Sequence, residues 1–209
     1  MKIKALLSIA LLTMAATSLN AANVTRDVPV TSDINALVTS SSVDVVYTVA
    51  PGAVKVSVTG PDNLVPMVQV VKKGQTLNIG VQKPKDVKHL NLKGLKVIVH
   101  GPVVYAIKAH TSSDIEFTNQ LNVGNKTLKL HADTSADIEI PEVSSTGTVN
   151  INADTSADIK IKTLRADQLT VDANTSADVE MSTVNVTTMD LKANTSADIK
   201  IGAAAVSII

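Results

Sequence analysis

Five aspartates recur at one position of a repeated phrase, and they are the residues of this chain best placed to do chemistry. The phrase is Thr-Ser-Ala-Asp-Ile or a close variant, and its aspartates are Asp114, Asp137, Asp158, Asp178 and Asp198. Consecutive aspartates are separated by 23, 21, 20 and 20 residues. Carboxylates repeated in this way could bind a hard cation, take part in acid–base catalysis, or form a charged row that contacts a ligand.

A row of stacked aspartates must have its charge offset. If the repeats stack as β-strands, neighbouring carboxylates lie ~4.8 Å apart, and each pair repels by about 1 kcal/mol in water. Hydroxyl groups of the adjacent Thr and Ser residues, backbone N–H groups and water can offset this repulsion. The next outward row, Glu116, Glu139, Lys160, Glu180 and Lys200, offers partial neutralisation. We therefore interpret the aspartates as a candidate binding face that needs no metal.

Calcium binding is the alternative for the same carboxylates. Asp133 and Asp154 would flank the corners of the repeats and could add oxygen ligands. The phrase, however, lacks the glycine-rich turn of the nonapeptide calcium β-roll. We expect calcium to raise the melting temperature by no more than about 2 °C, and a larger shift would favour a metal-binding row.

The four histidines offer a weaker signal. His110 and His131 belong to neighbouring repeats but occupy offset positions, and His89 and His100 lie elsewhere. A zinc site needs convergent ligands in tetrahedral geometry, and the sequence spells out no close pair. We interpret these histidines as solvent-facing side chains, and we predict neither a metal nor a cofactor.

Catalysis is also not favoured by the repeat. Parallel β-helices do host polysaccharide lyases and hydrolases, but an active site is a local break in a repeat because its acid and base need different pKa values. The aspartates here recur in nearly identical surroundings, and the chain has no Gly-x-Ser-x-Gly elbow, phosphate-binding glycine loop or His-Glu-x-x-His. We predict a protein that is not an enzyme, with a polysaccharide-active β-helix as a less favoured alternative.

The residues around each aspartate indicate the elements that position it. Apolar residues occupy every second position on both sides of each Thr-Ser corner, as in Leu128, Leu130 and Ala132. Period-two alternation is typical of strands with one buried face. Residues 105–209 are therefore predicted to form a right-handed parallel β-helix-like solenoid, with an antiparallel meander as the alternative. Stacking would place Ala132, Ala153, Ala173 and Ala193 in one interior row and Ile138, Ile159, Val179 and Ile199 in another.

The segment 22–104 lacks the strict period. Residues 41–45 are a degenerate copy of the phrase, residues 46–59 and 68–81 are each predicted to form a hairpin, and residues 95–100 alternate like a strand. We predict a mixed β layer that caps one end of the solenoid, because an open coil end exposes unpaired backbone groups.

The N-terminus and the composition indicate export. Residues 1–21 combine Lys2 and Lys4, a short apolar stretch and a small residue, Ala21, as a secretory signal peptide does. Without it, 17 basic and 19 acidic residues remain, so no nucleic-acid footprint is expected. No later segment is long and apolar enough for a transmembrane helix. Cysteine is absent and only 3 residues are aromatic (Tyr 2, Phe 1, Trp 0), which suits an exported all-β protein with small interior spaces.

The same motifs carry a family resemblance. Val43-Asp44-Val45, Gly60-Pro61-Asp62-Asn63-Leu64 and the serial Ser-Ala-Asp-Ile phrases resemble the putative auto-transporter adhesin, head GIN domain family. The family's repeats commonly carry glycines that Thr-Ser-Ala-Asp replaces here. The resemblance covers most of the chain and implies an exported or surface all-β protein without catalytic residues to carry over.

These observations lead to an expected function. We expect an adhesin-like scaffold of the periplasm or cell surface whose partner is a glycan, a surface protein or a second copy of the chain. The alternative is a periplasmic structural or envelope-stress protein that has no external ligand.

Overall fold

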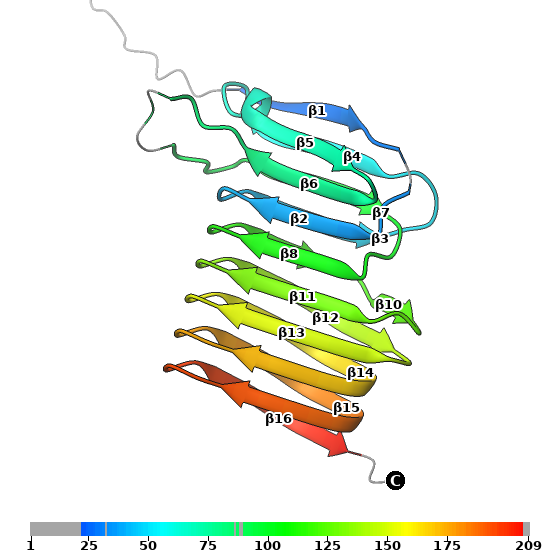
Figure 1. The fold of residues 1–209 in the computed structure, drawn as a ribbon. Helices are drawn as coiled ribbons and strands as arrows, with labels where there is room; N and C mark the ends of the chain where they lie inside the picture. The colour runs from blue at the N-terminus through cyan, green and yellow to red at the C-terminus, as the bar shows by residue number, and fades with distance from the viewer. Residues whose placement is uncertain (1–21, 32, 86, 88–89, 207–209) are drawn as a thin grey trace, which may run out of the picture.

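The computed structural model describes residues 22–31, 33–85, 87 and 90–206. The predicted signal peptide and His89 lie outside these residues. Sixteen described strands form one sheet (Figure 1). They are β1 (Asn23–Pro29), β2 (Ala36–Ser40), β3 (Asp44–Val49), β4 (Lys55–Pro61), β5 (Val68–Lys73), β6 (Thr76–Val81), β7 (Lys96–Gly101), β8 (Ala106–His110), β9 (Asp114–Phe117), β10 (Leu121–Gly124), β11 (Leu128–Asp133), β12 (Asp137–Ser145), β13 (Thr148–Asp154), β14 (Asp158–Ala173), β15 (Asp178–Ala193) and β16 (Asp198–Val206); a single 3-10 turn, η1 (Val65–Met67), precedes β5.

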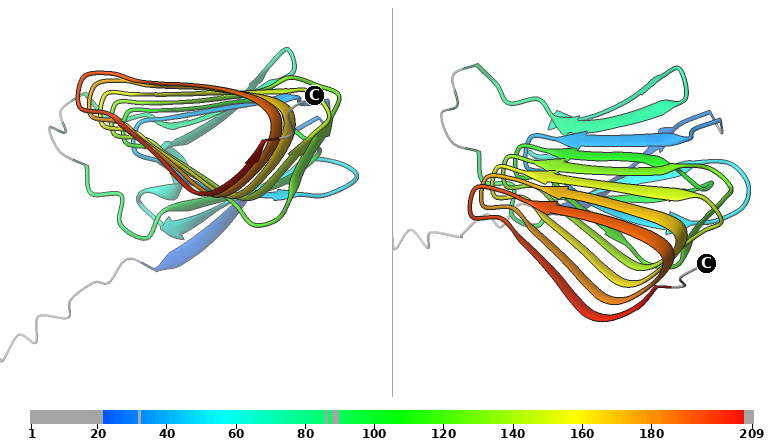
Figure 2. Two further views of the ribbon diagram at one scale, coloured as in Figure 1. Left: turned by 90° about the horizontal axis from the view of Figure 1, so that it is seen from below. Right: turned by 60° about the horizontal axis from the view of Figure 1, so that its bottom comes forward.

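The repeats form stacked coils, which confirms the predicted solenoid. Successive copies pair in parallel and in register, for example β12 with β14 and β14 with β15. The antiparallel meander is therefore wrong, because it would pair each strand with its neighbour within one unit. Figure 2 shows the coils nested on one another around a single interior. The 16-residue strands β14 and β15 each bend around the coil and serve both of its faces.

Aliphatic rows fill the interior of the coils. Ala132, Ala153 and Ala173 are in register and fully buried beside the corner, where the two strands of a coil converge. Ile159 and Val179, also in register and fully buried, belong to a second row. Small and β-branched side chains suit this thin interior, which explains why the chain can dispense with most aromatic residues.

Each corner is a pair of residues with left-handed backbone. Thr134 has φ 55° and Ser135 has φ 60°, and the same conformation recurs at Ser41/Ser42, Thr111/Ser112, Thr155/Ser156, Thr175/Ser176 and Thr195/Ser196. Two consecutive left-handed residues reverse the chain sharply. The corners also bond to one another: the Ser156 N–H donates to the Thr175 carbonyl, and the Ser176 N–H donates to the Thr195 carbonyl, each at 3.0 Å.

The N-terminal segment contributes both a coil and a cap. Strands β2 and β3 pair in parallel with β8 and β9, and Asp44 is in register with Asp114. The copy of the phrase at residues 41–45 is therefore a coil of the stack. Beyond it, β6 pairs with β2 and β7 pairs with β3, and antiparallel partners complete a mixed layer. The predicted hairpin over residues 68–81 is confirmed as the β5–β6 pair.

The predicted hairpin over residues 46–59 is wrong. Strand β7 lies between β3 and β4, parallel to the first and antiparallel to the second. The segment that joins β3 to β4 must therefore cross the width of β7. Local sequence could not reveal this insertion, because β7 is supplied by a distant segment: Val97 lies 52 positions after its partner Val45 and 39 after its partner Val58.

The two ends of the stack differ. The mixed layer covers the N-terminal end, whereas β16 at the other end pairs with β15 alone. Leu191 and Val206, in the last coils, are large apolar residues that remain exposed. Within the described ranges, no helix is long and apolar enough to cross a bilayer.

Candidate functional site

The structure places the five predicted aspartates in one row. Asp137 is in register with Asp114 and Asp158, and Asp158 is in register with Asp178, which in turn is in register with Asp198. Asp44 extends the row to six residues. We call Asp44, Asp114, Asp137, Asp158, Asp178 and Asp198 the aspartate row. Each residue begins the strand that follows a Thr-Ser or Ser-Ser corner, so the backbone ladder fixes its position.

Positive charge is concentrated at the C-terminal half of the row. The Lys200 ammonium lies 3.4 Å from an Asp178 carboxylate oxygen, 3.5 Å from Glu180 and 3.9 Å from Asp198. Lys160 lies 3.8 Å from Asp158. These contacts confirm the partial neutralisation expected from the neighbouring row of Glu and Lys residues.

The middle of the row, at Asp114 and Asp158, is where ionisation of the carboxyl groups is least favourable. Partial burial, followed by the charges of Asp137 and Asp44, raises the pKa of Asp114 to about 6. Burial and the Asp137 charge also raise the pKa of Asp158, although Lys160 opposes the shift. Like-charge repulsion and partial burial therefore destabilise the ionised carboxylates of the row. A cationic or hydrogen-bond-donating ligand would reduce this repulsion.

Asp114→Asn should make the protein more stable at neutral and alkaline pH. The folded state holds the Asp114 proton more tightly than the unfolded state, so stability falls as pH rises from about 4 to about 6. Because Asp114 keeps contact with solvent, screening limits the expected gain above pH 7 to about 1 kcal/mol, and no gain remains below about pH 4. Urea unfolding at pH 4 and pH 8 measures this difference.

Asp198→Asn is the matched control for that substitution. Asp198 ends the row, has one in-row neighbour, and lies 3.9 Å from the Lys200 ammonium. Its removal should leave stability at pH 8 unchanged or slightly lower. An equal gain from both variants would show that the row does not concentrate its charge at Asp114.

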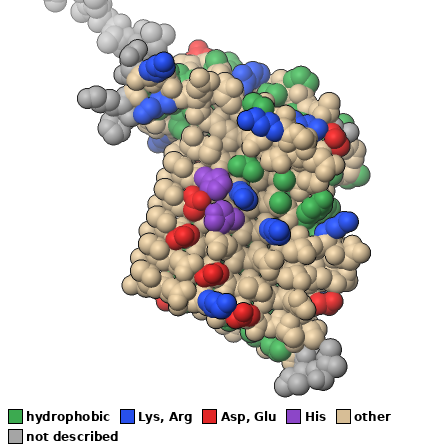
Figure 3. Space-filling view, in the orientation of Figure 1, with side chains coloured by type: hydrophobic (Ala, Val, Ile, Leu, Met, Phe, Trp, Pro, Cys, Tyr) green, Lys and Arg blue, Asp and Glu red, His purple; other side chains and the backbone are tan. Residues whose placement is uncertain are grey.

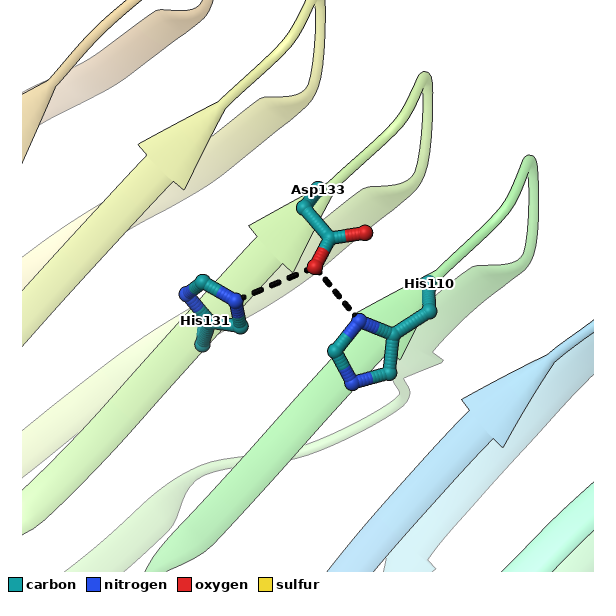
Figure 4. Close-up of side chains that lie close together, drawn as sticks. All are labelled: His110, His131 and Asp133. Atoms are coloured by element: carbon teal, nitrogen blue, oxygen red, sulfur yellow. Dashed lines mark hydrogen bonds and ion pairs between the residues drawn. The ribbon is translucent and has the colours of Figure 1, made fainter.

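A second cluster joins two histidines to a carboxylate on the other side of the corners (Figure 4). The His110 Nδ1 lies 2.6 Å from an Asp133 carboxylate oxygen, and the His131 Nε2 lies 3.2 Å from the same oxygen. The two imidazole rings meet edge to face, with centroids 5.6 Å apart. We call His110, His131 and Asp133 the histidine cluster.

Strand pairing explains why these three residues meet. Strands β8 and β11 are parallel, and their register sets His110 beside Asp133. His131 is two residues before Asp133 on β11, so both side chains leave the same face of the sheet. All three side chains are about 30% exposed, so the cluster is open to solvent.

The cluster was missed in the sequence, where the two histidines were interpreted as separate solvent-facing residues. The signal was nevertheless present. Aligning Ala109 with Ala132, as the repeat demands, sets His110 opposite Asp133 and puts His131 on the same strand face. The pKa of Asp133 is lower than its ordinary value. Burial acts to raise this pKa, but the hydrogen bond and charge of His110, with hydrogen bonds from Thr134 and His131, outweigh burial.

A hollow in the sheet surface adjoins the histidine cluster. It has a volume of about 390 Å³ and is lined by His131, Asn152, Asp172, Lys108 and Lys129 among others. Figure 3 shows histidine, acidic and basic side chains gathered on this face. Leu130 and Ile151 also line this hollow, which lies on a different face from the aspartate row.

Two solved structures share the fold. A protein described as a putative adhesin from Parabacteroides distasonis superposes with a TM-score of 0.67 at 19% identity, over 87% of this chain and 79% of the other. A second, described as a putative adhesin from Bacteroides fragilis, superposes with a TM-score of 0.56 at 18% identity, over 88% of this chain and 97% of the other. At these identities the likeness shows the fold. No curated protein matches the sequence.

Comparison with protein families gives a more specific result. One family matches residues 33–207, which include all the coils and nearly all of the N-terminal layer. This match confirms the resemblance seen in the repeated phrases and in residues 43–45. The chain belongs to the putative auto-transporter adhesin, head GIN domain family.

Proposed function

We propose that this protein is an exported, non-catalytic scaffold that binds a glycan or a surface protein in the manner of an adhesin. The observation that carries the proposal is the aspartate row. Its six carboxylates sit in register on consecutive coils, so the backbone fixes both their direction and their spacing. Membership of an adhesin family supports the same function.

A row of this kind favours many weak contacts over one strong contact. Each coil offers an equivalent carboxylate, and simultaneous contacts on one rigid body raise the overall affinity well above that of a single contact. Rigidity also reduces the entropy that binding must remove from the protein. Hydroxyl or amine groups repeated along a polymer would match this arrangement, because each can donate a hydrogen bond to a carboxylate.

Binding is favoured over catalysis because equivalent carboxylates repeat on consecutive coils and because the family is described as one of adhesins. A glycosidase needs two carboxyl groups whose environments hold one protonated and one ionised. Burial and the charges of Asp137 and Asp44 raise the pKa of Asp114, so Asp114 is the place in the row where an acid–base pair would be sought. Turnover of a polysaccharide that a single aspartate substitution abolishes would support the alternative of a polysaccharide-active enzyme.

The test is binding of the purified protein to arrays of glycans and matrix proteins. We expect Asp137→Asn/Asp158→Asn/Asp178→Asn to lower the affinity for the array ligand about tenfold or more, since three adjacent contacts are lost. The matched control, Asp154→Asn/Asp172→Asn/Asp190→Asn, removes three aspartate charges that lie outside the aspartate row. Equal loss in both variants would mean that net charge, and not the row, determines binding.

Location separates this function from the alternative of a periplasmic structural or stress protein. An adhesin must be reachable from outside, so protease added to intact cells should degrade it. Protection in intact cells, with degradation after lysis, would contradict adhesion and favour the envelope role.

A further inference from the structure

We propose that the histidine cluster, His110, His131 and Asp133, is a binding site for a divalent transition-metal ion of the zinc class. The site lies on the face formed by β8 and β11 and is separate from the aspartate row. The inference goes beyond the adhesin-like function and does not depend on it.

The spacing of the ligand atoms fits one small ion. The His110 nitrogen, the His131 nitrogen and the Asp133 oxygen all lie within 4.8 Å of one another. Ligands at zinc distances of about 2.0–2.1 Å in tetrahedral geometry are separated by about 3.3 Å. The His131–Asp133 distance of 3.2 Å already has this value, and the His110–Asp133 distance of 2.6 Å must open by less than 1 Å.

The partner of His131 prepares its other nitrogen for a cation. The Nδ1 of His131 lies 2.7 Å from the amide oxygen of Asn152, which can accept a hydrogen bond from the Nδ1–H tautomer. In that tautomer the Nε2 lone pair faces an Asp133 oxygen at 3.2 Å. Two acceptors that face each other need a positive species between them, either a second proton or a metal ion. A ligating histidine that donates its remaining N–H to a fixed oxygen is the usual arrangement in metal sites.

The cluster is also a local break in the repeat. At the corner position held by His110 and Asp133, the following coils carry Asp154, then Asn174 and Asn194. At the position of His131, the neighbouring strands carry Lys108 and Asn152. The stack thus brings two imidazoles and a carboxylate together across two adjacent coils, β8 and β11, whereas the following coils carry Lys or Asn at one or both of these positions.

The ligand types indicate which ion the site selects. Imidazole nitrogen suits zinc, copper, nickel and iron, whereas calcium and magnesium prefer sites made of oxygen alone. Three protein ligands leave at least one coordination position for water, and the partial exposure of all three side chains gives the ion a path from solvent. The ammonium of Lys108, in register with His131, makes the site weaker than a closed structural zinc site.

The experiment measures uptake of Zn²⁺ and Co²⁺ by the protein, purified without a polyhistidine tag. We expect one Zn²⁺ per chain by calorimetry, a rise in melting temperature, and a visible absorption band with Co²⁺. His131→Ala and Asp133→Asn should weaken zinc binding about 100-fold or more, and Asn152→Ala about tenfold. Calcium should produce neither uptake at this site nor a shift above about 2 °C.

His100→Ala is the matched control, because His100 is an exposed histidine on β7, away from the cluster. This variant should bind zinc like the parent, and circular dichroism should show that every variant keeps its strand content. Absence of zinc uptake by the parent protein, or uptake that survives in both His131→Ala and Asp133→Asn, would overturn the proposal.

Discussion

Ile159→Ala should lower the free energy of unfolding by about 3 kcal/mol, because it opens a cavity that the stacked coils cannot close. Ile159 is fully buried and lies between Ile138 and Val179 of the adjacent coils. The backbone ladders above and below hold the coils at a fixed separation, which prevents collapse around the missing atoms. Thermal and urea unfolding followed by circular dichroism would measure the loss.

Ile199→Ala is the matched control in the same interior row. Ile199 is only partly buried and has one in-row neighbour, Val179, because β16 is the last strand of the stack. We expect a loss of about 1 kcal/mol or less from this substitution. A loss equal to that of Ile159→Ala would show that the last coil is covered in solution, as self-association through the open end would require.

Thr175→Gly/Ser176→Gly should raise the free energy of unfolding by about 2 kcal/mol. Both residues have left-handed backbone, with φ of 53° and 62°, which costs an L-residue about 1–2 kcal/mol and glycine almost nothing. Glycine gives back part of this gain because its unfolded chain is more flexible. Both side chains are exposed, and the corner's bonds to its neighbours run through the backbone, so the substitutions preserve them.

The control for the corner is Thr183→Gly, an exposed threonine in the strand that follows. It has ordinary extended backbone within β15, where glycine is expected to lower stability by about 0.5–1 kcal/mol. Opposite signs at the two sites would identify backbone strain as the cause. If the corner variant were also destabilised, strain at the corners would not be the explanation.

The strained backbone of each corner sets the position of the aspartate that follows it. Each corner pair reverses the chain within two residues, and after one intervening residue the next strand begins with an aspartate of the row. A tight corner therefore fixes where each carboxylate leaves the coil. Thr and Ser at these left-handed positions accept strain that glycine would avoid, and these residues are exposed at the edge of the coils.

The sequence alone predicted the solenoid, its register and the aspartate row, and the parallel pairing of the strands excluded the antiparallel meander. Identical phrases at a near-constant spacing can each be buried in the same way only if equivalent residues stack, so Asp137, Asp158 and Asp178 had to lie in line. The same reasoning located the degenerate copy at residues 41–45, whose Asp44 joins the row. Apolar residues at every second position of the repeats predicted which side chains face the interior, because successive side chains of a strand point to opposite faces.

Tertiary structure decided what the repeat could not encode. The insertion of β7 between β3 and β4 depends on a pairing of distant strands, and the local pattern of residues 46–59 is equally compatible with a hairpin. The histidine cluster depends on side chains whose positions differ by two residues within their units, so comparing equivalent positions kept them apart. The repeat alignment gives the register and the face of these residues, but only the folded sheet shows that both imidazoles turn toward one Asp133 oxygen.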